Sequence, residues 1–88
     1  MRKRKVKIVY EELGDNPPTG QNATPFGDCV KDTGRIRIDP RQSASEMLDS
    51  EVHELCHAAW KYMSEGSVHR GASIIAEALW KLGYRKKR

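Results

Sequence analysis

The chain has 88 residues, of which 38% are apolar and 32% charged, and its formal net charge is +4 at pH 7. This length predicts a single domain over residues 1–88 with one modest core, and the composition is that of a globular protein rather than a disordered one. No apolar run approaches the roughly 20 residues that cross a bilayer and no export signal is visible, so we expect a cytoplasmic protein without a membrane partner.

The positive charge lies at the two ends of the chain. Arg2–Lys5 and Arg85–Arg88 contain eight of the sixteen basic residues, so eight basic residues face twelve acidic ones between these tails. The body is therefore acidic, and we expect short solvated tails at both ends. Binding of nucleic acid by the tails, which would weaken steeply with salt, is the less favoured alternative. The two cysteines, Cys29 and Cys56, are too few for a disulfide framework and are expected to be reduced thiols in the core.

Three segments near the N-terminus have the features of strands. Lys5–Glu11 alternates with a period of two. Gly14–Pro25 collects Gly, Pro and Asn and predicts a surface loop. Gly27–Lys31 and Arg35–Asp39 flank Asp32-Thr33-Gly34, a short connection of the kind that closes a hairpin. We expect a small, largely antiparallel sheet of three strands.

Two helices follow the sheet. Ser43 and Glu46 fit a capping box, which predicts that a helix begins there and continues to about Tyr62 or Met63. Ser67 is the expected cap of the second helix, and Gly83 is placed to end it. The expected buried positions of the second helix are Ala72, Ile75, Leu79 and Leu82. The fold class predicted is α+β, with the sheet packed on two helices.

The first helix carries the motif His53-Glu54-Leu55-Cys56-His57. Residues four apart on a helix project from one face, so the two imidazoles can share one tetrahedral zinc ion. Glu54 then lies beside the open coordination position without being a ligand. From there it can accept a proton from a metal-activated water and pass it to the leaving amine of a peptide bond.

A catalytic zinc site needs a third protein ligand. We expect Glu77 on the second helix, because its neighbours are apolar and an unpaired carboxylate among them would be costly to bury. Glu65 and His69, near the turn between the helices, are the competing candidates. His69 could instead donate a hydrogen bond to the oxyanion of the tetrahedral intermediate.

Glu51–Ala58, together with Ala76–Leu79, resembles the zincin metallopeptidases of the gluzincin type and is most similar to the very short, phage- or prophage-encoded zinc peptidases. The resemblance implies a minimal zincin core that uses the motif residues and Glu77 around Zn²⁺. It also implies that an edge strand, matched here by Gly34–Asp39, binds an extended polypeptide substrate by strand addition. One departure is Lys81, which stands where larger gluzincins have an acidic residue that supports a zinc histidine.

The expected function is therefore that of a zinc-dependent metallopeptidase, acting as an endopeptidase. The alternative is a non-catalytic protein-binding module braced by zinc, for example a phage factor that binds a host protein. Such a structural site would be closed by a fourth ligand, for which Cys56 or His69 could serve, and the presence of Glu54 favours the enzyme.

Overall fold

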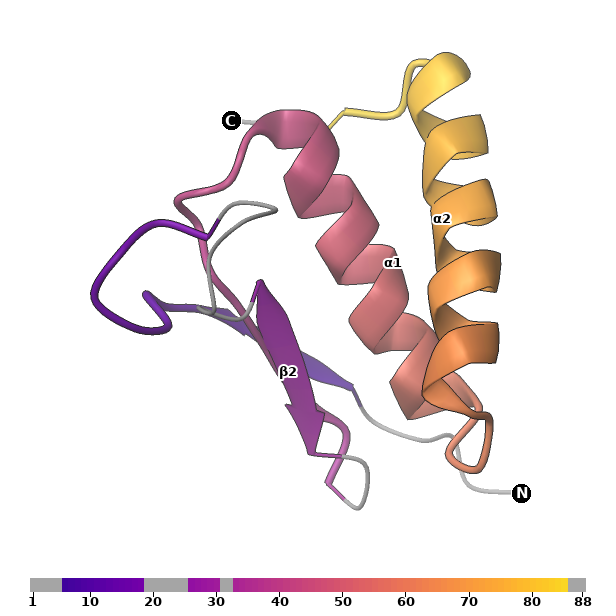
Figure 1. The fold of residues 1–88 in the computed structure, drawn as a ribbon, viewed down its shortest axis with the longest axis horizontal. Coiled ribbons are helices and arrows are strands. Elements are labelled where there is room, and N and C mark those ends of the chain that lie inside the picture. The colour runs from indigo at the N-terminus through magenta and orange to yellow at the C-terminus, as the bar shows by residue number, and fades with distance from the viewer. Residues whose placement is uncertain (1–5, 19–25, 31–32, 86–88) are drawn as a thin grey trace.

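The computed structural model describes residues 6–18, 26–30 and 33–85. Three short strands, β1 (Lys7–Tyr10), β2 (Gly27–Val30) and β3 (Arg35–Ile38), precede two helices, α1 (Ala44–Ala59) and α2 (Glu65–Lys81). The α+β class is confirmed, with the sheet on one side of α1 and α2 on the other (Figure 1). Three predicted features lie wholly or partly outside the described part of the chain. These are the basic tails other than Arg85, residues 19–25 of the loop, and residues 31–32 of the hairpin.

The sheet is mixed, which corrects the expectation of a largely antiparallel one. Its strand order is β1-β3-β2. The predicted hairpin pairs β2 antiparallel with β3, whereas β1 pairs parallel with β3, Ile8 lying opposite Ile36. Alternation in a sequence predicts which side chains share a face but not the direction of a strand. β3 is therefore the central strand and β2 an edge strand.

The alternation of β3 is what fixes the sheet on α1. Ile36 and Ile38 are fully buried and form one core cluster with Ala58 of α1. Arg35 and Arg37 occupy the alternate positions, and the Arg37 guanidinium forms an ion pair with Asp28 of β2 on the outer face. The sheet thus has one apolar face towards the helix and one charged face away from it, as the sequence predicts.

The capping box predicted for α1 is confirmed. The Glu46 N–H donates to Ser43 Oγ over 3.3 Å, and the Ser43 N–H donates to Glu46 Oε1 over 3.1 Å. The helix ends at Ala59, three or four residues before the predicted end, and the Trp60 N–H donates to the Cys56 carbonyl as its cap. The chain therefore turns directly after the second histidine of the motif.

α1 ends before its predicted end, and α2 likewise begins before its predicted start. Its cap is Ser64 rather than the predicted Ser67: the Ser67 N–H donates to Ser64 Oγ over 3.2 Å. Glu65 is consequently the first residue of the helix and not part of a loop. At the other end Gly83 has a φ of +94° and closes the helix as expected, its N–H donating to the Trp80 carbonyl.

The two helices enclose a second core cluster, and α2 contacts no described element except α1. Four residues of α2 face this cluster, but Ile75 and Leu82, which we expected to be buried, are exposed. The cluster consists of Val52 and Cys56 of α1 with Val68, Ala72 and Ala76 of α2, flanked by Leu48 and Leu79.

No helix within the described ranges has the length and apolar character needed to cross a membrane.

A buried ion pair joins the segment after β1 to the turn before α1. Asp39 is fully buried, and its two carboxylate oxygens accept hydrogen bonds from the Leu13 N–H at 2.8 Å and the Arg41 N–H at 2.9 Å. The Arg41 guanidinium donates to both oxygens, at 2.8 and 3.0 Å. Hydrogen bonds from Arg41 above all hold the pKa of Asp39 well below its usual range. This cluster fixes the chain where it leaves the sheet for α1.

Candidate metal centre

Two of the predicted ligands lie side by side on α1. The Nε2 atoms of His53 and His57 are 3.2 Å apart, and the rings meet edge to face with centroids 4.9 Å apart. Donor atoms about 2.0–2.1 Å from a tetrahedral zinc ion lie roughly 3.3 Å from each other. The imidazole pair therefore already has the spacing that a shared zinc ion requires.

Glu65 brings a carboxylate to the same point. Its Oε1 lies 2.9 Å from His53 Nε2, and its Oε2 lies 2.7 Å from His57 Nε2. Desolvation acts to raise the pKa of Glu65, but the charges and hydrogen bonds of the two histidines lower it overall. The three residues are the one group in the described ranges with ligand atoms all within 4.8 Å of one another.

Glu77 lies elsewhere, which corrects its predicted position beside the histidines. Its side chain is 68% exposed, and its Oε1 pairs with Lys81 Nζ at 2.9 Å. Because α2 runs antiparallel to α1, the first turn of α2 faces His57 and the end of α1. Glu77 is twelve residues further on, about 18 Å along the helix axis. The residue near the histidines is Glu65, the competing candidate.

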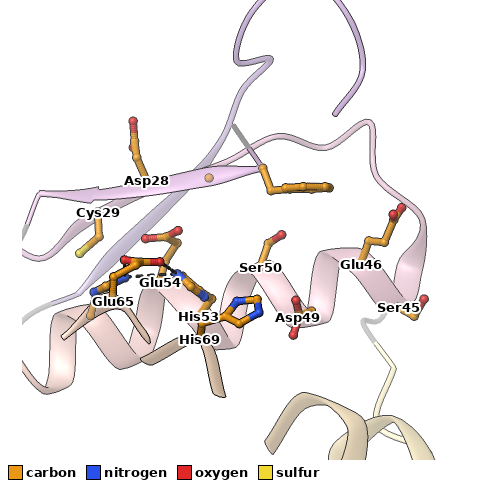
Figure 2. Close-up of a pocket in the computed structure, with 13 residues that line it drawn as sticks. Asp28, Cys29, Ser45, Glu46, Asp49, Ser50, His53, Glu54, Glu65 and His69 are labelled. Atoms are coloured by element: carbon orange, nitrogen blue, oxygen red, sulfur yellow. Dashed lines mark hydrogen bonds and ion pairs between the residues drawn. The ribbon is translucent and has the colours of Figure 1, made fainter. Parts of the chain in front are cut away.

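Glu54 is the buried acid of the site. It is 8% exposed, projects between α1 and β2, and lies beside Glu65 in Figure 2. Desolvation, reinforced by the negative charges of Glu65 and Asp28, raises the pKa of Glu54 to about 7. A carboxyl group with this pKa exchanges protons readily near neutral pH, which is the property required of a general acid or base.

His69 lies next to the histidine pair, and its predicted role as an oxyanion donor stays a prediction. It lies one turn after Glu65 on α2, and its ring centroid is 6.0 Å from that of His53. Its exposed ring faces the same cavity. The geometry therefore leaves His69 able to contact a molecule bound at the centre.

A cavity of about 740 Å³ opens over the centre, between α1 and β2. This volume is within the range of pockets that bind small molecules or a few residues of a peptide. Figure 2 shows the groups of the centre at one end of the cavity, with Asp49, Glu46 and Ser45 along α1 towards the other. The complete lining is Phe26, Gly27, Asp28, Cys29, Ser45, Glu46, Asp49, Ser50, His53, Glu54, His57, Glu65 and His69.

The edge strand beside this cavity is β2, not Gly34–Asp39. The latter segment contains β3, which is central and hydrogen-bonded on both sides. Gly27 comes close to the catalytic candidate: a Cβ built on it would lie 3.4 Å from Glu54 Cγ and 2.8 Å from the Arg37 carbonyl oxygen. A residue without a side chain is therefore needed where β2 passes Glu54.

The cysteines occupy different environments. Cys56 lies in the core between the helices, as predicted, and burial raises the pKa of its thiol. Cys29 packs against the sheet cluster but also lines the cavity. Its pocket position was not predicted, because a lone cysteine in a strand shows neither which face it occupies nor what covers that face.

Comparison with protein-family models, with curated proteins and with solved structures finds no match. The resemblance to zincins therefore remains a prediction from the sequence, carried by the motif His53-Glu54-Leu55-Cys56-His57.

Proposed function

We propose that this protein is a zinc-dependent peptidase in which His53, His57 and Glu65 hold the metal and Glu54 is the acid–base group. The observation that carries the proposal is the meeting of two imidazoles and a carboxylate at one point, with a second, buried carboxylate beside them. Three protein ligands are the number found in catalytic zinc sites, whereas structural sites have four. A zinc ion held there supplies a Lewis acid that polarises a substrate carbonyl and acidifies water.

Glu54 carries the proton transfers of the proposed reaction. Its carboxylate takes a proton from the attacking water and delivers it to the leaving amine, so that the peptide bond breaks without release of an amide anion. Burial alone favours the protonated form of Glu54. A cation bound by the neighbouring histidines favours the ionised form instead, which is the form that accepts the proton.

The substrate we propose is an extended polypeptide bound along β2. One edge of β2 pairs with β3, and no described strand pairs with the other. A peptide added at that edge finds backbone N–H and C=O groups to pair with and lies beside the cavity. His69 is available there as a donor to the developing oxyanion.

The position of Cys56 supports an enzyme over a zinc-braced binding module. Cys56 was one candidate for the fourth ligand of a closed site, but it packs among Val52, Val68 and Ala72 in the helix core. A closed site would therefore need His69 to turn inwards from its exposed position.

The test is a comparison of zinc content and peptide cleavage among matched variants. Glu65→Ala should lower zinc affinity more than about 100-fold, because losing a group that merely supports a ligand already costs 10- to 100-fold. Glu77→Ala, a glutamate of the same helix, should leave zinc affinity unchanged. Glu54→Gln should retain zinc and lose cleavage of an unfolded protein substrate.

Two results would contradict the proposal. Equal zinc affinity of Glu65→Ala and wild type would remove Glu65 from the ligand set. Cleavage by Glu54→Gln at the wild-type rate, or cleavage that persists after complete removal of metal by a chelator, would rule out the mechanism.

A further inference from the structure

The cavity continues well beyond the metal centre. From His53 it follows α1 towards the start of the helix, past Asp49 to Glu46 and Ser45. A second, smaller cavity of about 230 Å³ shares Ser45 and Asp49 with it and extends to Trp80 on α2. Asp49 therefore borders both cavities, about 6 Å along the helix axis from the centre.

Apart from its histidines, the described titratable side chains that line the larger cavity are acidic, with Cys29 as the one thiol. The lining includes the carboxylates of Glu46 and Asp49 as well as those of the centre, and no lysine or arginine is among the described residues that line it. Glu46 is engaged in the capping box. Asp49 is half-buried and forms no hydrogen bond or ion pair within the described part of the chain, so its charge is available to a ligand.

A separate observation indicates that the cavity takes a ligand. Glu54 is more than nine-tenths buried, projects into the cavity, and has no hydrogen-bond partner among the described residues. Burying a carboxylate without a partner is unfavourable unless something else satisfies it. A ligand at this end of the cavity would lie in line with Asp49, which is the next acidic residue along α1.

The direction of β2 sets the direction of a bound chain. β2 runs from the end of the cavity near Glu46 towards the metal centre, Cys29 lying beyond Asp28 in Figure 2. A peptide added antiparallel to β2, the slightly more stable arrangement, runs the opposite way. The residues that follow its scissile bond then pass Asp49 and Glu46.

We propose that this protein selects polypeptide segments with a lysine or arginine two residues after the scissile bond, and that Asp49 receives the cationic side chain. The proposal rests on the peptidase function above for the position of the bond. At about 3.3 Å per residue, two residues of an extended chain cover the distance from the centre to Asp49, and three reach Glu46.

The experiment compares two peptides that differ only by Lys or Gln at the second residue after the bond. The wild type should cleave the Lys peptide with a kcat/KM about fivefold higher, the scale of one partly screened ion pair, and the ratio should fall with added salt. In Asp49→Asn the ratio should fall to about one. Glu11→Gln, an equal charge change at an exposed residue on the β1 side, should keep the wild-type ratio.

Binding separates this proposal from the peptidase function. With Glu54→Gln as the background, the affinity of the same labelled peptides is measured by fluorescence anisotropy, with and without Asp49→Asn. Tighter binding of the Lys peptide that depends on Asp49 supports the proposal even if the wild type cleaves nothing, in which case only the peptidase function fails. Equal affinities and equal cleavage rates, or a preference only for Lys before the bond, overturn it.

Discussion

Removal of the Asp39 carboxylate tests how the fold is held at the entrance to α1. In Asp39→Ala the N–H groups of Leu13 and Arg41 lose their acceptor, and the Arg41 guanidinium loses its buried partner. Removing one member of a buried ion pair costs about 3–5 kcal/mol. An 88-residue domain has only about 4–13 kcal/mol of unfolding free energy. We therefore expect the melting temperature to fall by at least about 12 °C.

Thermal unfolding followed by circular dichroism measures this, and Asp28→Asn is the matched control. Asp28 also pairs with an arginine, but both side chains of that pair are about 40% exposed, so its loss should cost less than about 1 kcal/mol. Similar stability losses in the two variants would refute the view that the Asp39–Arg41 pair stabilises the fold more than the Asp28–Arg37 pair.

The Asp39 carboxylate makes the stability of the fold depend on pH, and its pKa shift sets the direction of that dependence. Because the pKa of Asp39 is lowered on folding, its contribution to stability is fully present above the pKa of the unfolded chain, near 4. It is lost as the pH falls below that value. Urea titrations between pH 6 and pH 2.5 should therefore show a smaller loss of stability in Asp39→Ala than in the wild type, and parallel curves would contradict this account.

Three further outcomes follow from the site. In the metal-free protein, the raised pKa of Glu54 means that the unfolding free energy falls as the pH rises from about 4.5 to about 7. Urea unfolding should therefore show that Glu54→Gln stabilises the metal-free protein at pH 8 and not at pH 4. Gly27→Ala should cost about 1–3 kcal/mol of unfolding free energy and lower the kcat of the proposed cleavage, since its Cβ meets the Arg37 carbonyl oxygen. A variant as stable as the wild type would contradict this. Ser64→Ala should cost about 1 kcal/mol and weaken zinc binding by loosening Glu65, whereas Ser67→Ala should leave zinc binding unchanged.

The sequence predicts the parts of the fold that depend on local patterns. The capping box of Ser43, the alternation of β3, and Gly83 as a helix end are all confirmed, because each depends on residues within a few positions of one another. The pairing of β1 was not predictable in the same way. Its parallel direction depends on where a long connection returns the chain, and alternation carries no information on that.

The third member of the metal group shows how a small local error becomes a large spatial one. The predicted cap at Ser67 left Glu65 near the turn, while Glu77 was chosen because its sequence neighbours are apolar. The structure begins α2 at Glu65, within reach of both histidines. The signal that distinguishes the two starts is the length of α1, which ends at Ala59 and leaves only five residues before Glu65.

The arrangement of α2 has a consequence for how the protein responds to metal. Among the described elements α2 contacts only α1, and the ion we propose would join the first turn of α2 to the last turns of α1. The ion would thus hold α2 on α1 in addition to the apolar side chains that pack between the two helices. Metal binding would then stabilise the closed arrangement of the two helices, and we expect removal of the ion to weaken the contact of α2 with α1.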